Sequence, residues 1–129
     1  MSKKALIITD DSESIKTIAR FISDSLKGFD VKTCSAQKFE GTDILPVDVF
    51  FLGCEETSPS SFAYLEDMLA HINLASRKCG IFSVNEKPIN YLCGIVKDCD
   101  ADFGSPLHVA SKEIPVPALE KWVKSIVSN

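Results

Sequence analysis

The sequence predicts an α/β fold built on a doubly wound parallel sheet, with helices on both faces. Short apolar runs rich in β-branched residues alternate along the chain with longer stretches whose apolar residues recur at helical spacing. This alternation is typical of right-handed βαβ units, which produce a parallel sheet. Most of the short runs are apolar almost throughout, as strands covered on both faces must be. We therefore expect five strands in the order 2-1-3-4-5.

The first half of the chain supplies three of these strands. Lys4–Thr9 is the first, and a helix is expected to follow over Ser14–Lys27. The apolar face of that helix consists of Ile15, Ile18, Ala19, Ile22 and Leu26. Asp30–Ser35 alternates polar and apolar residues, which predicts a strand at or near the sheet edge. Residues 36–46 are too few and too mixed for a long helix, and the third strand follows at Val47–Gly53.

The second half continues the alternation. A helix is expected over residues 58–72, followed by a strand at Cys79–Val84 and a helix at Pro88–Cys99. The fifth strand, Asp102–Ala110, is less regular because a glycine and a proline interrupt it. Residues 115–126 have the spacing of a closing helix.

Composition excludes several classes of protein. The 129 residues, 45% of them hydrophobic and 25% charged, suffice for one folded core, and no linker or repeat divides them, so we expect a single domain over 1–129. The net charge is -4, so we do not expect the basic surface that drives nonspecific nucleic-acid binding. No apolar run is long enough for a membrane span or a secretion signal. We expect a cytoplasmic protein that binds neither nucleic acid nor membrane.

The cysteines point to the same compartment. Their number is odd, no Cys-x-x-Cys pair occurs, and most of their neighbours are apolar, so we expect five reduced and mostly buried thiols. They are Cys34, Cys54, Cys79, Cys93 and Cys99.

Several local strings occur in the serial order of one known family. They are ALIITDDSESIKTIA, VDVFFLGC, SPSSFAYLEDML, KCGIFSVNEKPINYLCGIV and ADFGSPLHVASKEIPVPALEKWV. In this order they resemble the flavodoxin family over essentially the whole chain. The resemblance implies a flavodoxin-like fold, FMN as cofactor, electron transfer with a protein redox partner, and a site beyond the carboxyl ends of the strands.

In flavodoxins the loop after the first strand wraps the FMN phosphate and is rich in Ser, Thr, Gly and Asn. Counted back from Ala19, the corresponding residues are Asp10, Asp11, Ser12, Glu13, Ser14 and Ile15. Ser12 and Ser14 match the family in kind. Glu13 stands where the family has glycine, Ile15 where it has threonine, and Asp10 where it has a hydroxyl.

The carboxylates of this loop oppose a phosphate when they point inward. A helix amino terminus attracts an anion by ~0.3–1 kcal/mol. A carboxylate about 5 Å from a phosphate charge repels it by roughly 3 kcal/mol at an effective dielectric near 20. One inward carboxylate therefore cancels the helix contribution, whereas acids that face solvent leave it intact. The sequence leaves both orientations open.

Two further loops would contact the flavin ring. Cys54 and Glu55 follow the third strand, in a loop that lacks the aromatic residue many flavodoxins stack on the ring. After the fourth strand, Asn85 leads toward Tyr91, the one candidate for stacking in this region. Tyr91 also fits the apolar face of its own helix, and Cys54 also fits a buried strand end.

Asp10 and Asp11 also resemble the acidic pair of response-regulator receiver domains. Those domains carry a phosphoaccepting Asp at the end of the third strand, where this chain has Gly53. A Mg²⁺ site at Asp10, Asp11 and Glu55 would use the oxygen ligands that this ion prefers, although solvated surface acids give the same pattern.

The sequence leaves two functions of different kinds open. One is an FMN-dependent electron carrier whose FMN binding is weakened by the acidic phosphate loop. The other is a flavin-free interaction or regulatory module that keeps the fold and binds a regulatory protein partner.

Overall fold

The computed structural model describes residues 3–110 and 113–128 and contains one parallel sheet. Its strands are β1 (Lys3–Thr9), β2 (Phe29–Ser35), β3 (Val49–Gly53), β4 (Lys78–Ser83), β5 (Asp102–Phe103) and β6 (Leu107–His108). They lie in the order β2-β1-β3-β4-β5, with β6 also paired to β4, and every pairing is parallel. The predicted fold class and strand order are confirmed.

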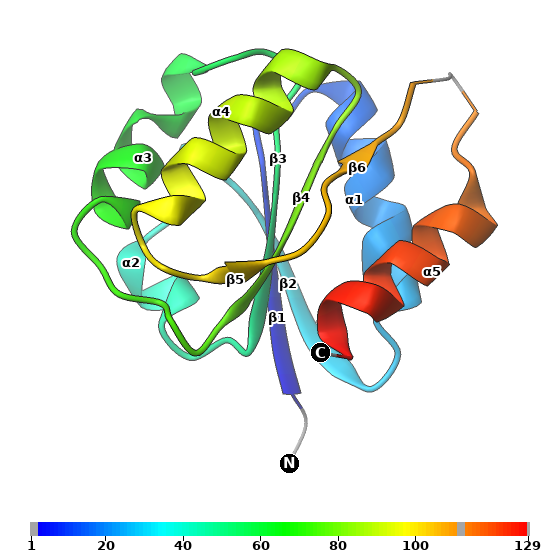
Figure 1. Cartoon of the computed structure of the whole chain (residues 1–129), viewed down its shortest axis with the longest axis horizontal. Helices are drawn as coiled ribbons and strands as arrows, with labels where there is room; N and C mark the ends of the chain where they lie inside the picture. The colour runs from blue at the N-terminus through cyan, green and yellow to red at the C-terminus, as the bar shows by residue number, and fades with distance from the viewer. Residues whose placement is uncertain (1–2, 111–112, 129) are drawn as a thin grey trace.

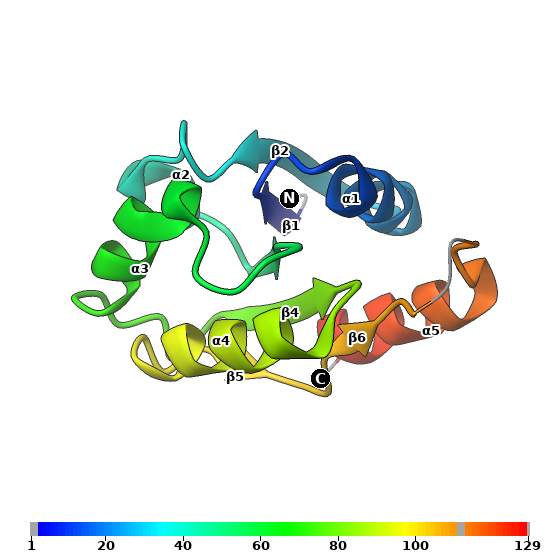
Figure 2. The ribbon, with the colours of Figure 1, turned by 90° about the horizontal axis from the view of Figure 1, so that it is seen from above.

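Helices cover both faces of the sheet (Figures 1 and 2). They are α1 (Glu13–Ser25), α2 (Gly41–Ile44), the 3₁₀ helix η1 (Ser60–Phe62), α3 (Ala63–Leu69), α4 (Glu86–Lys97) and α5 (Val116–Val127). Helices α1 and α5 lie on one face, and α2, α3 and α4 lie on the other. The single turn of α2 occupies the segment that was too short for a long helix. None of the helices in the described ranges is long and apolar enough to cross a membrane.

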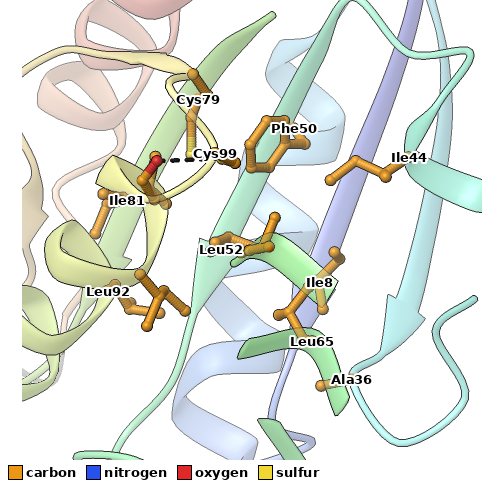
Figure 3. Close-up of a cluster of buried hydrophobic side chains, with 14 of the residues drawn as sticks. Ile8, Ala36, Ile44, Phe50, Leu52, Leu65, Cys79, Ile81, Leu92 and Cys99 are labelled. Carbon is orange, nitrogen blue, oxygen red and sulfur yellow. Dashed lines mark hydrogen bonds between the residues drawn. The ribbon is translucent and has the colours of Figure 1, made fainter. Parts of the chain in front are cut away.

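Two apolar clusters, one on each face, explain why the central strands are apolar throughout. Successive residues of a strand point to opposite faces. Thus Leu6 and Ile8 of β1 pack toward α2, α3 and α4, whereas Ala5 and Ile7 pack toward α1 and α5. Figure 3 shows the first cluster, with labelled side chains from the strands and from the helices that cover them: Ile8, Phe50, Leu52 and Ile81, and Ile44, Leu65 and Leu92.

The fifth predicted strand is divided in two. Its halves, β5 and β6, pair with the two ends of β4 and are separated by a segment that contains Gly104 and Pro106. Pro106 has no N–H to donate to a sheet. The indole Nε1 of Trp122 donates to the carbonyl of Ser105 at 2.7 Å and so provides the broken segment with a partner from α5.

Candidate functional site

The carboxyl ends of β1, β3 and β4 lie at the same edge of the sheet, where the loops that follow them meet. The chain leaves β1 toward α1 on one face and β3 toward α3 on the other. Such a change of direction between neighbouring parallel strands opens a crevice in doubly wound folds. Of the loop residues predicted for a flavin site, Glu13, Ser14, Glu55 and Asn85 line hollows at this crevice.

Asp10 joins the loops after β1 and β3. Its Oδ1 accepts hydrogen bonds from the backbone N–H of Ser12 at 3.1 Å and from the Ser12 hydroxyl at 2.7 Å. Its Oδ2 accepts the backbone N–H of Glu55 at 2.8 Å. Ser14 adds a second link, because its hydroxyl donates to Oε2 of Glu55 at 3.2 Å. The carboxylate of Asp10 is therefore turned toward these two loops and accepts hydrogen bonds from three donors.

The loop after β4 is tied to the same place. The side-chain amide of Asn85 donates to the carbonyl of Glu55 at 2.9 Å. Beneath it, the buried hydroxyl of Ser83 donates to the carbonyl of Cys54 at 2.6 Å and accepts the N–H of Asn85 at 3.2 Å. Sequence reasoning missed Ser83, although one polar residue near the carboxyl end of an apolar strand was a usable signal.

The side chains of Glu13, Asp11 and Ile15 take no part in the hydrogen bonds around Asp10. The side chain of Glu13 is 92% exposed and lies 3.9 Å from the ammonium of Lys16. Asp11 is exposed, and its φ of 68° is in the left-handed region that Asp tolerates better than most residues. Ile15 is fully buried in the cluster beneath α1 and α5, so its side chain belongs to the core.

Cys54 and Tyr91, both predicted near a flavin ring, belong to the same apolar face: Cys54 lies in its buried cluster and Tyr91 packs against that cluster. Cys54 is buried, and burial, together with the charge of Asp10, raises the pKa of its thiol to about 12. Tyr91 lies on α4, packs against the apolar cluster on that face and donates its hydroxyl to Glu66 of α3 at 3.0 Å. Burial, followed by this bond to Glu66, raises the pKa of Tyr91 well above its usual value. Tyr91 therefore braces two helices and lines neither hollow of the crevice.

Two hollows flank the hydrogen bond between Asn85 and Glu55. The first has a volume of about 520 Å³ and is lined by Glu13, Ser14, Thr17, Ile18, Glu55, Val84, Asn85, Val109, Ala110 and Ile114. The second, of about 490 Å³, is lined by Glu55, Glu56, Thr57, Asn85, Glu86, Lys87 and Pro88. No aromatic side chain is among these lining residues. The crevice is thus acidic and is divided by a protein hydrogen bond.

Gly53 ends β3 where receiver domains would carry the phosphoaccepting Asp. A Cβ atom added at this position would overlap the ring of Phe82. A side chain therefore fits here only if Phe82 moves. Across residues 3–110 and 113–128, no group of three or more His, Cys, Asp or Glu side chains is placed to hold a metal ion.

Several solved flavodoxins have the same arrangement. A short-chain flavodoxin associated with a non-canonical PDU bacterial microcompartment superposes with a TM-score of 0.85 at 14% identity, covering 99% of this chain and 98% of that one. The flavodoxin of Streptococcus pneumonia TIGR4 gives 0.83 at 16%, covering 98% and 99%. Flavodoxin 2 from Bacillus cereus gives 0.81 at 17%, with the same coverage. The chain has a flavodoxin-like fold.

This flavodoxin-like fold is shared at sequence identities too low to carry function with it. No family model matches the sequence, and no curated protein matches it as a relative. A response regulator from Thermotoga maritima aligns over all of both chains with a lower TM-score of 0.58, at 17% identity.

Proposed function

We propose that this chain is a flavin-free interaction or regulatory module on the flavodoxin-like fold, with a protein as its partner. The observation that carries the proposal is the inward carboxylate of Asp10, which holds the N–H groups of Ser12 and Glu55. By resemblance to flavodoxins, the phosphate of FMN would lie against this same loop.

A flavin phosphate does not fit the residues present. The phosphate would bring its charge beside Asp10, and two such charges about 5 Å apart repel by roughly 3 kcal/mol at an effective dielectric near 20. The favourable interaction of the phosphate with the amino terminus of α1 offsets only ~0.3–1 kcal/mol of this repulsion. The ring is no better provided for, because the Asn85–Glu55 hydrogen bond crosses the crevice and no aromatic side chain lines the hollows.

Flavin titration tests the first half of the proposal. The purified protein should be colourless, and neither FMN nor riboflavin should show saturable quenching of flavin fluorescence at micromolar concentrations. Stoichiometric binding of FMN would overturn the flavin-free assignment.

Crosslinking in cells tests the second half. Glu56 is exposed and lines the second hollow. Asp24 is also exposed, but it lies near the carboxyl end of α1, whereas the crevice is at the amino end of that helix. If the crevice binds a protein, Glu56→Lys should remove its crosslinked partner and Asp24→Lys should keep it. An identical set of crosslinks in both variants and in the wild type would contradict a partner at this edge.

An FMN-dependent electron carrier is the second candidate, favoured by the similarity to flavodoxins over nearly the whole chain. With its phosphate loop opposed by Asp10, such a carrier would hold the flavin through the ring. It predicts comparable affinities for FMN and riboflavin, which the same titration measures.

A further inference from the structure

We propose that the carboxylate of Asp10 is a built-in anion, which occupies the position of a ligand anion at the start of α1 and thereby holds the loops after β1 and β3 together. The inference concerns this loop alone and goes beyond the proposed function.

The donors around Asp10 are of the kind that proteins use to bind anions. They are two backbone N–H groups and one hydroxyl, at 2.7 to 3.1 Å. Two of them come from Ser12 and the third comes from Glu55, on the loop after another strand. Hydrogen bonds to an ionised acceptor are roughly twice as strong as neutral ones. The carboxylate is thus bound by two loops at once, as an external anion would be.

The amino terminus of α1 is arranged around this internal anion. Ser12 is the N-cap residue of α1, yet no side chain caps the helix, and the Ser12 hydroxyl donates to Asp10. The partial positive charge of a helix start favours an anion within its first turn. Asp10 provides that negative charge from the residue two positions before the cap.

Of the neighbouring acids, Glu13 and Asp11 do not share this role, whereas the carboxylate of Glu55 accepts the hydroxyl of Ser14 in the first turn of α1 at 3.2 Å. Glu13 is 92% exposed and is paired with Lys16, and Asp11 is exposed. The negative charge that faces the loop interior therefore comes from Asp10 among the acids of residues 10–13. An external phosphate would have to displace this carboxylate and approach its charge. The wild type should therefore bind a free anion poorly at this position.

Removal of the carboxylate should make the position available to a free anion. The probe is inorganic phosphate, titrated by calorimetry and by the amide chemical shifts of Ser12 and Glu55. Asp10→Ser should bind phosphate at least about tenfold more tightly than the wild type, and the gain should shrink as salt rises. Asp11→Asn is the matched control: it changes the net charge equally and leaves the Asp10 contacts in place, so its gain should be much smaller.

Asp10→Asn serves if Asp10→Ser does not fold, because it keeps the side-chain size while it removes the charge and replaces one acceptor oxygen with an NH2 group. The proposal is overturned if the wild type binds phosphate as tightly as these variants, if folded variants bind no more than the wild type, or if Asp11→Asn gains as much. The two proposals can fail separately. If the wild type binds a flavin through contacts to the ring, the proposed function is wrong. The present inference would still hold, because inorganic phosphate has no ring and tests the anion position alone.

Discussion

The carboxylate of Asp10 accepts the backbone N–H of Glu55 at 2.8 Å, from a residue 45 positions further along the chain. The bond joins the loops that follow β1 and β3, the two strands between which the chain changes face. It therefore lies at the place where doubly wound folds usually receive a ligand. The same contact contributes to stability.

Loss of this contact should be measurable in the wild-type background. In Asp10→Asn the side-chain nitrogen cannot accept the N–H of Glu55, and the charge that strengthens all three bonds disappears. The free energy of unfolding should fall by about 1–3 kcal/mol. Urea unfolding followed by the fluorescence of Trp122, the single tryptophan, measures it. Asp11→Asn, at an exposed position, should stay within about 0.5 kcal/mol of the wild type.

The end of β3 should not accept a side chain. Gly53→Ala places a Cβ against the ring of Phe82, and relief of that overlap should cost about 1–3 kcal/mol. Gly94→Ala is the control on α4, where a Cβ meets nothing within 4 Å, and it should stabilise the protein by about 0.5–1 kcal/mol. Chemical denaturation of both variants decides the matter, and equal effects would refute the steric argument.

The thiols should be unreactive in the native protein and should make it sensitive to alkali. All five cysteines are free in the structure, and thiol titration in denaturant without reductant should find five. Burial raises the pKa of Cys54 to about 12 and that of Cys34 to about 11, from 9.0. Since the thiolate is the reactive form, native protein at about pH 8 should react slowly with Ellman's reagent.

The sign of the pH dependence follows from the raised pKa values. Folding favours the neutral thiols, so their contribution to stability is fully present below pH 9.0 and is lost as the pH rises toward about 11 and about 12. The free energy of unfolding should therefore fall from pH 9 upward. A stoichiometric disulfide, or stability that is constant across this range, would contradict the prediction.

The indole of Trp122 should stabilise the broken edge of the sheet. Trp122→Phe keeps an aromatic ring near Phe51, whose centroid lies 5.7 Å away, but loses the N–H donated to Ser105. We expect a loss of roughly 1–3 kcal/mol, from the unpaired carbonyl and the smaller ring. Unfolding followed by circular dichroism measures it, because the variant lacks tryptophan fluorescence. Tyr64→Phe, at a half-exposed ring, should change stability by less than about 0.5 kcal/mol.

The fold was predictable because burial on two faces leaves a strong local pattern. β1 is apolar at both Leu6 and Ile7 since each side chain meets a different layer of helices. The division of the fifth strand was foreshadowed by Gly104 and Pro106, and local sequence does contain that information. Local sequence does not show which residue contacts the broken segment, because Trp122, whose indole donates to the carbonyl of Ser105, lies on the last helix of the chain.

The place of the candidate site was also predictable, because the carboxyl ends of parallel strands meet at one edge. The direction of each side chain there was not. Asp10 turns inward because of an N–H contributed by Glu55, whereas Glu13 turns outward beside Lys16 one helical turn away. For Tyr91, helical spacing allowed both a flavin contact and a core position, and local sequence did not show that its hydroxyl donates to Glu66 of α3.

The break in the outer strand has a consequence for how copies of this chain meet. β5 and β6 have two residues each, and they pair only with the ends of β4, at Lys78 and Cys79 and at Phe82 and Ser83. An incoming strand needs a continuous row of backbone donors and acceptors. This border offers two strands of two residues each, with a proline between them. The division thus makes this border of the sheet a poor template for edge-to-edge pairing between copies of the chain.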